Sequence, residues 1–350
     1  MLRRNICKYK KKIFEFLANN QKGKPSNGLP FLNIYNMTQK QKVIYLKRKV
    51  HKMKKYISID IGGTAIKYGI ICENAEIMMK ETMKTEAEKG GSAILEKVFV
   101  IVEKLQGRIQ EKASGICIST AGMVNTEQGA IFYSAPLIPN YTGMQFKKLL
   151  EDKFKIPCEV ENDVNCAGLA EYRSGAAKGS HVALILTIGT GIGGSIIMDG
   201  EVYHGFSNSA CEVGYMHMND SDFQTLGAAS ILTKKVSEWK GETEKKWDGY
   251  HIFEEAKKGD KLCLLAIDEM VDILGEGIAN ICYVINPEVV VLGGGIMAQE
   301  QFLKERVECA VKRYLVSSIE EHTKIVFAKH QNDAGMLGAF YHFCNARHLM

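Results

Sequence analysis

The sequence predicts an α/β protein made of two similar halves, and three observations lead to that fold class. Three apolar strand patterns follow one another at 56–60, 65–72 and 75–84. Two strand patterns of the same kind return later in the chain, at 181–188 and 192–199. In both halves a glycine-rich turn joins the first two strands, and alternating helices and strands follow. We therefore expect a duplicated α/β architecture of two domains with a ligand-binding cleft between them.

The rest of the first half alternates between helical and strand patterns. Its apolar spacing predicts a helix at 91–106, a strand at 115–119, a helix at 144–153, a strand at 158–160 and a helix from about 162. The segment 121–143 contains glycine and proline between these patterns, so it is predicted to be a functional loop.

The second half continues with a strong turn signal. Asp199-Gly200 is a typical two-residue hairpin turn, which predicts a further short strand after it. Beyond it the pattern predicts helices at 225–238, 250–258, 260–284, 298–314 and 334–344, and strands at 288–292 and 323–328. There is no short-period repeat.

Composition excludes several protein classes. A chain of 350 residues with 46% hydrophobic content can bury one large core or two modest ones. It has no run of 18 apolar residues, so no membrane span is expected. Its ten cysteines stand singly, without a C-x-x-C pair, which indicates reduced thiols in a cytoplasmic protein rather than a disulfide framework or a zinc site.

The net charge of +5 comes from the N-terminal segment. Residues 1–55 contain 16 Lys and Arg and one acid, Glu15, which leaves 29 basic and 39 acidic residues in 56–350. We therefore expect no nucleic-acid binding by the body. Residues 1–53 are predicted to be a basic extension, disordered or without function; a nucleic-acid-binding arm and a targeting segment are the alternatives. Met53 stands directly before the first strand as a natural start of the body.

The two glycine-rich turns indicate an ATP site. The first is Asp60-Ile-Gly-Gly-Thr64 and the second is Thr187-Ile-Gly-Thr-Gly191. Each lies between two strands, so the pattern is a hairpin and not the strand-to-helix turn of a dinucleotide site. Two facing hairpins would offer backbone N–H groups to a polyphosphate, which only glycine lets approach so closely. Asp60, at the end of its strand, is placed to hold Mg²⁺ through water.

Further motifs make the chain resemble a known family. Glu161-Asn-Asp163 lies between the two glycine turns, and Gly293-Gly-Gly295 and Asn332-Asp-Ala-Gly335 come after the second. The order of these motifs resembles that of ROK-family sugar kinases, a branch of the actin-like ATPase superfamily. The match covers nearly all of 56–345. It implies a duplicated actin-like ATPase (ribonuclease H-like) fold, with one domain of 54–166 plus 333–350 and another of 167–332. It also implies ATP and Mg²⁺ as cofactors, a sugar substrate and a homodimer.

The resemblance implies roles for the glycine motifs. The residues that it places against ATP are Asp60, Gly62, Gly63, Thr64, Gly189, Thr190, Gly191, Gly293, Gly294 and Gly295. Gly293 to Gly295 would form the adenosine motif, although a simple strand-to-helix turn also fits the pattern. Lys67 either approaches the phosphates or is an exposed strand lysine. Asn332 or Asp333 is expected to cap the last helix.

Asp163 matches the catalytic aspartate of the family. A carboxylate at a helix start can accept the sugar hydroxyl proton during phosphoryl transfer, because the helix fixes it and its N–H groups favour the ionised form. The resemblance further implies that Asn162, Gly122 and Asn140 face the sugar, and that Asp163 accepts the proton of the sugar 6-hydroxyl. Tyr141 either stacks on the sugar or plugs the cleft between the domains.

The chain departs from the common family pattern at one place. Typical members have Glu-x-Gly-His followed by a zinc-binding cysteine cluster and a second sugar-binding Glu, whereas this chain has Glu212-Val-Gly-Tyr215 and no cysteine after it. Glu212 and Tyr215 are therefore predicted sugar ligands without a zinc site, since His217 alone cannot hold zinc. Gln224 is the nearest substitute for the second Glu. Glucose, a β-glucoside and N-acetylmannosamine all remain open as substrates, because sites that hydrogen-bond a sugar discriminate strongly.

Two functions from other classes compete with the kinase. One is a sugar-responsive transcriptional regulator, whose winged helix would need more than the 55 residues that precede the first strand here. The other is an inactive sugar sensor. Asp163 and both glycine turns favour the kinase, since neither alternative needs them.

Overall fold

The computed structural model describes residues 53–134, 138–244 and 246–349. The chain divides into two units between Met53 and Lys54, and only the second is described below. The predicted basic extension therefore lies outside the described residues, apart from Met53. Among the described residues no helix is both long and apolar enough to cross a membrane.

The first half forms a five-stranded sheet in the order β3-β2-β1-β4-β7. These strands are β1 (Lys55–Ile61), β2 (Ala65–Cys72), β3 (Ile77–Lys84), β4 (Gly115–Thr120) and β7 (Cys158–Asn162). The first three form an antiparallel meander, whereas β4 and β7 join parallel to β1. Helices α4 (Gly90–Gln106) and α5 (Phe146–Phe154) bury apolar faces in the core of this half.

The second half repeats this topology in the sheet β10-β9-β8-β13-β14. Its strands are β8 (Val182–Ile188), β9 (Ile192–Met198), β10 (Glu201–Val202), β13 (Val289–Gly293) and β14 (Lys324–Phe327). Again the first three are antiparallel and the last two are parallel to the first. The predicted duplication is confirmed, and the two glycine turns occupy equivalent positions, between β1 and β2 and between β8 and β9.

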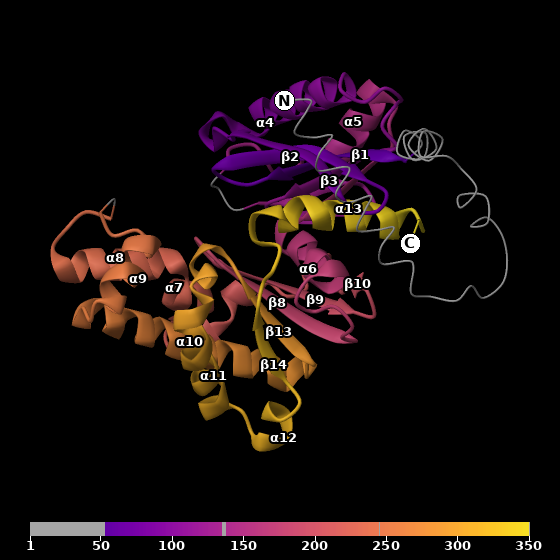
Figure 1. Cartoon of the computed structure of the whole chain (residues 1–350). Helices are drawn as coiled ribbons and strands as arrows, with labels where there is room; N and C mark the ends of the chain where they lie inside the picture. The colour runs from indigo at the N-terminus through magenta and orange to yellow at the C-terminus, as the bar shows by residue number, and fades with distance from the viewer. Residues whose placement is uncertain (1–52, 135–137, 245, 350) are drawn as a thin grey trace, which may run out of the picture. The chain divides into compact units, whose positions relative to one another are not determined.

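Two helices lie between the sheets (Figure 1). They are α6 (Asp163–Ser174) and α13 (Ala334–Ala346), which pack against each other. Their apolar side chains, such as Leu169 and Phe340, form one buried cluster with Ile71 of the first sheet and Ile185 of the second. The start of α6 is therefore fixed by packing on both sides.

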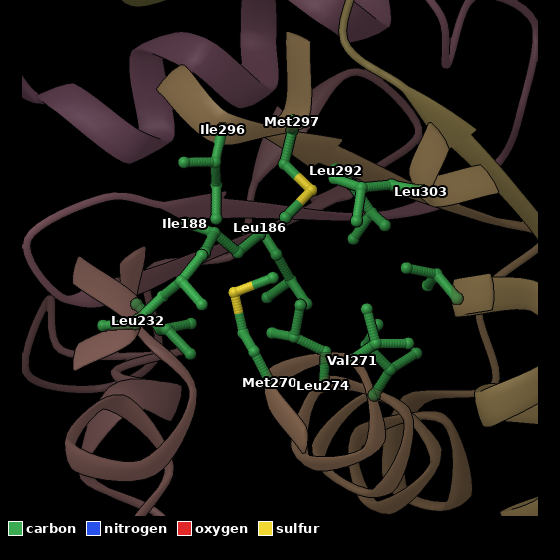
Figure 2. Close-up of a cluster of buried hydrophobic side chains, with 14 of the residues drawn as sticks. Leu186, Ile188, Leu232, Met270, Val271, Leu274, Leu292, Ile296, Met297 and Leu303 are labelled. Carbon is green, nitrogen blue, oxygen red and sulfur yellow. The ribbon is translucent and has the colours of Figure 1, made fainter. Parts of the chain in front are cut away.

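The other helices of the second half bury the far face of its sheet. They are α7 (Phe223–Gly227), α8 (Ala229–Lys240), α9 (Gly249–Lys257), α10 (Lys261–Ile285), α11 (Glu300–Tyr314) and α12 (Ser317–Glu320). Figure 2 shows Leu186 of β8 and Leu292 of β13 facing Met270 and Leu274 of α10 in this core. Asp260 starts α10 by accepting bonds from two backbone N–H groups.

Several elements differ from the sequence prediction. The expected helix at 225–238 is two helices, because Ala228 is extended (ψ 155°) and separates α7 from α8. The loop predicted at 121–143 contains a small hairpin of β5 (Met123–Asn125) and β6 (Ala130–Tyr133). Asp199 and Gly200 both have positive φ, as the predicted turn between β9 and β10 requires.

The predicted cap of the last helix is also wrong. The chain enters α13 from a 3₁₀ turn (Gln331–Asp333), so Asp333 has helical φ and ψ and no side-chain bond caps the helix. The carboxylate of Asp333 instead accepts bonds from Lys80 Nζ of β3, at 2.7 and 2.8 Å.

Candidate active site

The turn between β1 and β2 is held at its base and open at its tip. The Gly62 N–H donates to the Ala65 carbonyl (3.1 Å), and the Thr85 hydroxyl donates to the Gly62 carbonyl (2.6 Å). Gly63 and Thr64 are exposed, and apart from its two chain neighbours no described residue has an atom within 4 Å of where a Cβ on Gly63 would stand. The turn can therefore present backbone to a ligand without rearranging.

The equivalent turn between β8 and β9 is braced by helix α8. The Gly189 N–H donates to the Gly191 carbonyl (2.9 Å), which closes the turn. Ser230, in the first turn of α8, donates its hydroxyl to the Thr190 carbonyl (2.7 Å). Thr190 itself is exposed, so its hydroxyl is available to a ligand while its carbonyl is tied back.

The glycines after β13 lie beside this second turn. Gly293 pairs with Thr187 of β8. Gly294 has φ 104° and passes so close to β8 that a Cβ would lie 2.1 Å from the Ile188 carbonyl oxygen. Gly295 faces open space among the described residues. Only glycine allows this conformation and approach, which leaves a flat backbone surface next to the Gly189 turn.

Asp60 lies at the end of β1, next to the start of α13. Its Oδ1 accepts a bond from the Ser119 hydroxyl (2.7 Å), and Lys67 Nζ stands 3.6 Å from Oδ2. The helix approaches so closely that a Cβ on Gly335 would lie 2.4 Å from the carboxyl carbon. Burial raises the pKa of Asp60, and the bond from Ser119 and the charge of Lys67 partly offset this. Lys67 thus pairs with Asp60 and is not the freely exposed strand lysine that one interpretation expected.

Asn162 and Asp163 form the junction between β7 and α6. Asn162 is the N-cap, and its Oδ1 accepts the N–H groups of Val164 (2.9 Å) and Asn165 (3.1 Å). Its Nδ2 donates to the Gly122 carbonyl and to Asp163 Oδ1, both at 3.0 Å. Asn162 therefore fixes the Asp163 carboxylate and the predicted sugar-side backbone in one hydrogen-bond network.

The Asp163 carboxylate is unusually basic. Burial raises its pKa, the negative charges of Asp60 and Glu212 raise it further, and backbone N–H groups only partly compensate, so that the pKa is about 7. An acid of this pKa accepts and releases protons near neutral pH, which is the property of a general base. The electrostatic coupling also shows that three predicted residues, Asp60, Asp163 and Glu212, lie near one another.

Glu212 precedes a short 3₁₀ turn (Val213–Tyr215) that follows the β10 loop, and Tyr215 is the last residue of that turn. Both are exposed, and burial of part of each side chain raises its pKa. Gln224 lies near enough to Tyr215 to act on its hydroxyl and partly offset the rise in its pKa. A Cβ on Gly191 would lie 2.7 Å from Gln224 Oε1, so Gln224 also contacts the second glycine turn. The structure thus places the predicted substitute Gln224 beside Tyr215.

The remaining sugar-side predictions have mixed outcomes. Gly122 has φ 96° and accepts its bond from Asn162, as described above. Asn140 is exposed with φ 53°, and its carbonyl packs against Gly91 at the start of α4. Tyr141 is only 1% exposed, and its hydroxyl lies 2.5 Å from that of Thr120. The hypothesis that Tyr141 stacks on a sugar is therefore wrong, because its ring belongs to the core.

Sequence reasoning missed two residues of this site. Ser119 could have been found, because parallel pairing of β1 and β4 sets it directly opposite Asp60. His204 gave no signal, since it is a single histidine in a loop; its Nε2 lies 2.6 Å from the buried carboxylate of Glu161. Among the described residues, no group of three or more His, Cys, Asp or Glu could hold a metal ion.

Comparison with known proteins shows the family of the chain. A family model described as ROK family matches residues 56–345. An uncharacterized protein of Clostridium perfringens (strain 13 / Type A) is 51% identical over 285 residues, 81% of this chain and 96% of that protein. The β-glucoside kinase of Listeria innocua is 31% identical over 297 residues, 83% of this chain and 97% of that protein. A solved ROK family protein from Streptococcus pneumoniae TIGR4, in complex with sucrose, is 30% identical with a TM-score of 0.74, covering 85% of this chain and 100% of that one.

These similarities extend over the whole described body and not over one motif. The fold is the actin-like ATPase fold shared by the ROK sugar kinases, as the repeated sheet topology requires. The matched range begins at Tyr56 in β1 and ends at Asn345 near the end of α13, so it includes both glycine turns, Asp163 and Glu212. The chain belongs to the ROK family.

Proposed function

We propose that this protein is an ATP-dependent sugar kinase that transfers the terminal phosphoryl group of ATP to the 6-hydroxyl of a hexose or hexose derivative. The observation that carries the proposal is the Asp163 carboxylate, with a pKa of about 7, held at a helix start between Asp60 and Glu212. The two glycine turns beside it supply a place for a polyphosphate, and the β-glucoside kinase relative acts in the same class.

ATP binds along the glycine backbone. The triphosphate lies against Gly62 to Thr64 and Gly189 to Gly191, and the adenosine lies against Gly293 to Gly295. Asp60 fits Mg²⁺, because Asp60 and Asp163 repel each other electrostatically and a bound cation would offset that repulsion. When bound, that ion neutralises phosphate charge. Lys67 stands beside Asp60 and adds a second positive charge on this side.

The sugar binds on the other side of Asp163. Glu212 accepts hydrogen bonds from its hydroxyls, Asn162 stands beside them, and Tyr215 and the Gly122 backbone border the sugar. Asn140 contributes from the loop before α5. We infer that Tyr215 and Gln224 substitute for the histidine and the second glutamate of typical members and help select among glucose, β-glucosides and N-acetylmannosamine.

Asp163 acts as the general base. It accepts the 6-hydroxyl proton while the hydroxyl oxygen forms a bond to the γ-phosphorus and the bond from that phosphorus to the ADP oxygen breaks. Its desolvated site favours this transfer, because taking up the proton removes a charge that burial and two neighbouring carboxylates disfavour.

The product identifies the reaction. The full chain is incubated with ATP, Mg²⁺ and glucose, mannose, N-acetylmannosamine, cellobiose or gentiobiose, and the products are followed by phosphorus NMR. A phosphate monoester at carbon 6 is expected with at least one sugar, and the 6-deoxy form of that sugar should give none. Phosphorylation of the 6-deoxy sugar would contradict the assignment of the hydroxyl.

Three further expectations belong to this proposal. The protein acts in the cytoplasm and as a homodimer, and its body does not bind nucleic acid. The domain division at 166/167 and 332/333 allows the sugar and ATP sides to close on each other. A regulator or an inactive sensor would bind sugar without forming a phosphate ester, so the same NMR experiment separates those functions from the kinase.

A further inference from the structure

A buried carboxylate lies directly behind the proposed base. Glu161, the residue before Asn162 in β7, has no exposed surface. Its Oε1 accepts the Asn162 N–H (2.6 Å) and Asn165 Nδ2 (3.1 Å). Its Oε2 lies 2.6 Å from His204 Nε2 and 3.4 Å from His342 Nδ1. Because a carboxylate only accepts hydrogen bonds, His204 Nε2 carries the hydrogen in this contact.

His204 closes the loop that leads to the sugar ligand Glu212. The loop follows β10 of the second sheet, and its ends are joined because the Ala210 N–H donates to the His204 carbonyl (3.1 Å). Cys211 comes next and packs on β9, where a Cβ on Gly194 would lie 2.6 Å from its sulfur. Glu212 follows immediately. His204 therefore joins the loop that carries Glu212 to strand β7, which leads directly into Asp163 at the start of α6.

We propose that His204 is a positioning residue for the sugar. Its ion pair with Glu161 fixes the loop 204–211, so that Glu212 stands beside Asp163 when the sugar arrives. This inference rests on the proposed kinase function, in which Glu212 is a sugar ligand. It predicts that loss of the pair weakens sugar binding and leaves ATP binding unchanged, since the glycine turns make no contact with His204 among the described hydrogen bonds.

The charges around the pair make its strength depend on pH. Burial opposes the charged forms, but the mutual bond raises the pKa of His204 and lowers that of Glu161. Glu201 on β10 faces His204 with a further negative charge. His342 on α13 faces Glu161 from the other side, and burial lowers its pKa, so it stays neutral. The ion pair is present when His204 is protonated and weakens as pH rises past the ordinary value of 6.5 through its raised pKa.

The test compares His204→Ala and His204→Gln with wild type in the full chain. Steady-state rates give KM for the sugar and for ATP. His204→Ala should raise the sugar KM about tenfold, the effect of one lost charge-assisted hydrogen bond. His204→Gln keeps a neutral N–H donor and should recover part of this loss. The sugar KM of His204→Gln divided by that of wild type should fall as pH rises, because wild type loses its ion pair. Asp163 titrates in both proteins, so its effect cancels in this ratio.

A matched control is available on the surface. His181 pairs with Asp199 at 2.9 Å, but their side chains are 79% and 80% exposed, and His181→Ala should leave the sugar KM unchanged. An unchanged sugar KM in both His204 variants, with an active wild type, would overturn the inference, as would an equal rise in both KM values. A wild type that phosphorylates no sugar would instead contradict the proposed function itself. Melting curves show which variants are folded. If His204→Ala does not fold, His204→Gln alone is used for the test.

Discussion

Replacement of Asp163 by Asn should abolish turnover and at the same time stabilise the fold. The substitution keeps the shape of the side chain and leaves Oδ1 able to accept the Val164 N–H, now at 3.0 Å. It removes a negative charge from a site where burial, Asp60 and Glu212 all disfavour that charge. The protein therefore maintains an unfavourable charge for the sake of the reaction, and its removal should be visible in the free energy of unfolding.

The size and sign of the effect follow from the pKa. The ordinary value is 3.8 and the value in the folded protein is about 7. At 1.36 kcal/mol per unit, an ionised Asp163 costs at most about 4 kcal/mol, and a side chain with residual solvent contact costs less. A raised pKa means that the folded state binds the proton more tightly than the unfolded state does. The stability that this proton confers on the fold is therefore fully present below pH 3.8 and is lost as pH rises through about 7. The advantage of Asp163→Asn should thus be absent near pH 4 and reach about 1 to 4 kcal/mol at pH 8.

Denaturant unfolding of wild type and Asp163→Asn at pH 4, 6 and 8 measures this difference in the free energy of unfolding, and thermal unfolding measures the corresponding change in Tm. The gain at pH 8 should raise Tm by roughly 3 to 10 °C. Asp152→Asn, an exposed aspartate of α5 paired with Lys148, serves as the control and should change stability little at any of these pH values. A stability difference for Asp163→Asn that is the same at all three pH values, or that decreases with pH, would refute the account of a desolvated carboxylate repelled by its neighbours.

Three further predictions concern activity and the ATP site. The kcat/KM for sugar in wild type should rise with pH through about 7, because Asp163 must be ionised to accept a proton; a profile that is flat from pH 5 to 8 would remove Asp163 from the role. Glu212→Ala should raise the sugar KM tenfold or more, on the order of one lost charged hydrogen bond, and calorimetry that finds unchanged sugar affinity would argue against Glu212 as a ligand. Gly294→Ala should destabilise the fold by about 1 to 3 kcal/mol, because Gly294 has φ 104° and a Cβ would meet the Ile188 carbonyl. Gly295 faces open space, so Gly295→Ala should keep the wild-type Tm but raise the KM for ATP. Equal melting temperatures of the two variants would contradict this.

Much of the fold could be predicted because its signals are local. Apolar alternation and glycine turns located β1, β2, β8 and β9, and Asp199-Gly200 located the turn into β10. The break between α7 and α8 gave no such signal, since Ala228 is a good helix former that tertiary packing holds in an extended conformation. The cap at Asp333 failed for a related reason: a contact with Lys80, far away in sequence, uses the side chain.

The site was predictable where motifs follow one another and not where distant segments meet. Asn162 and Asp163 lie at a strand-to-helix junction that the sequence marks clearly. The contact of His204 with Glu161 spans 43 residues and depends on how the two sheets pack, so no local pattern contains it. Tyr141 shows the converse. An aromatic residue in a loop suggested sugar stacking, but its burial and its packing against Phe146 show that it is part of the core.

The most direct test of the account is ADP release by the full chain with ATP, Mg²⁺ and the sugar panel, measured for wild type and Asp163→Asn against a blank without sugar. We expect wild type to release ADP with at least one sugar well above the blank, and Asp163→Asn to bind that sugar with near wild-type affinity but release no ADP. Substantial ADP release by Asp163→Asn, or none by wild type with any sugar that shifts its melting temperature, would contradict the central claim that Asp163 is the base of a sugar kinase.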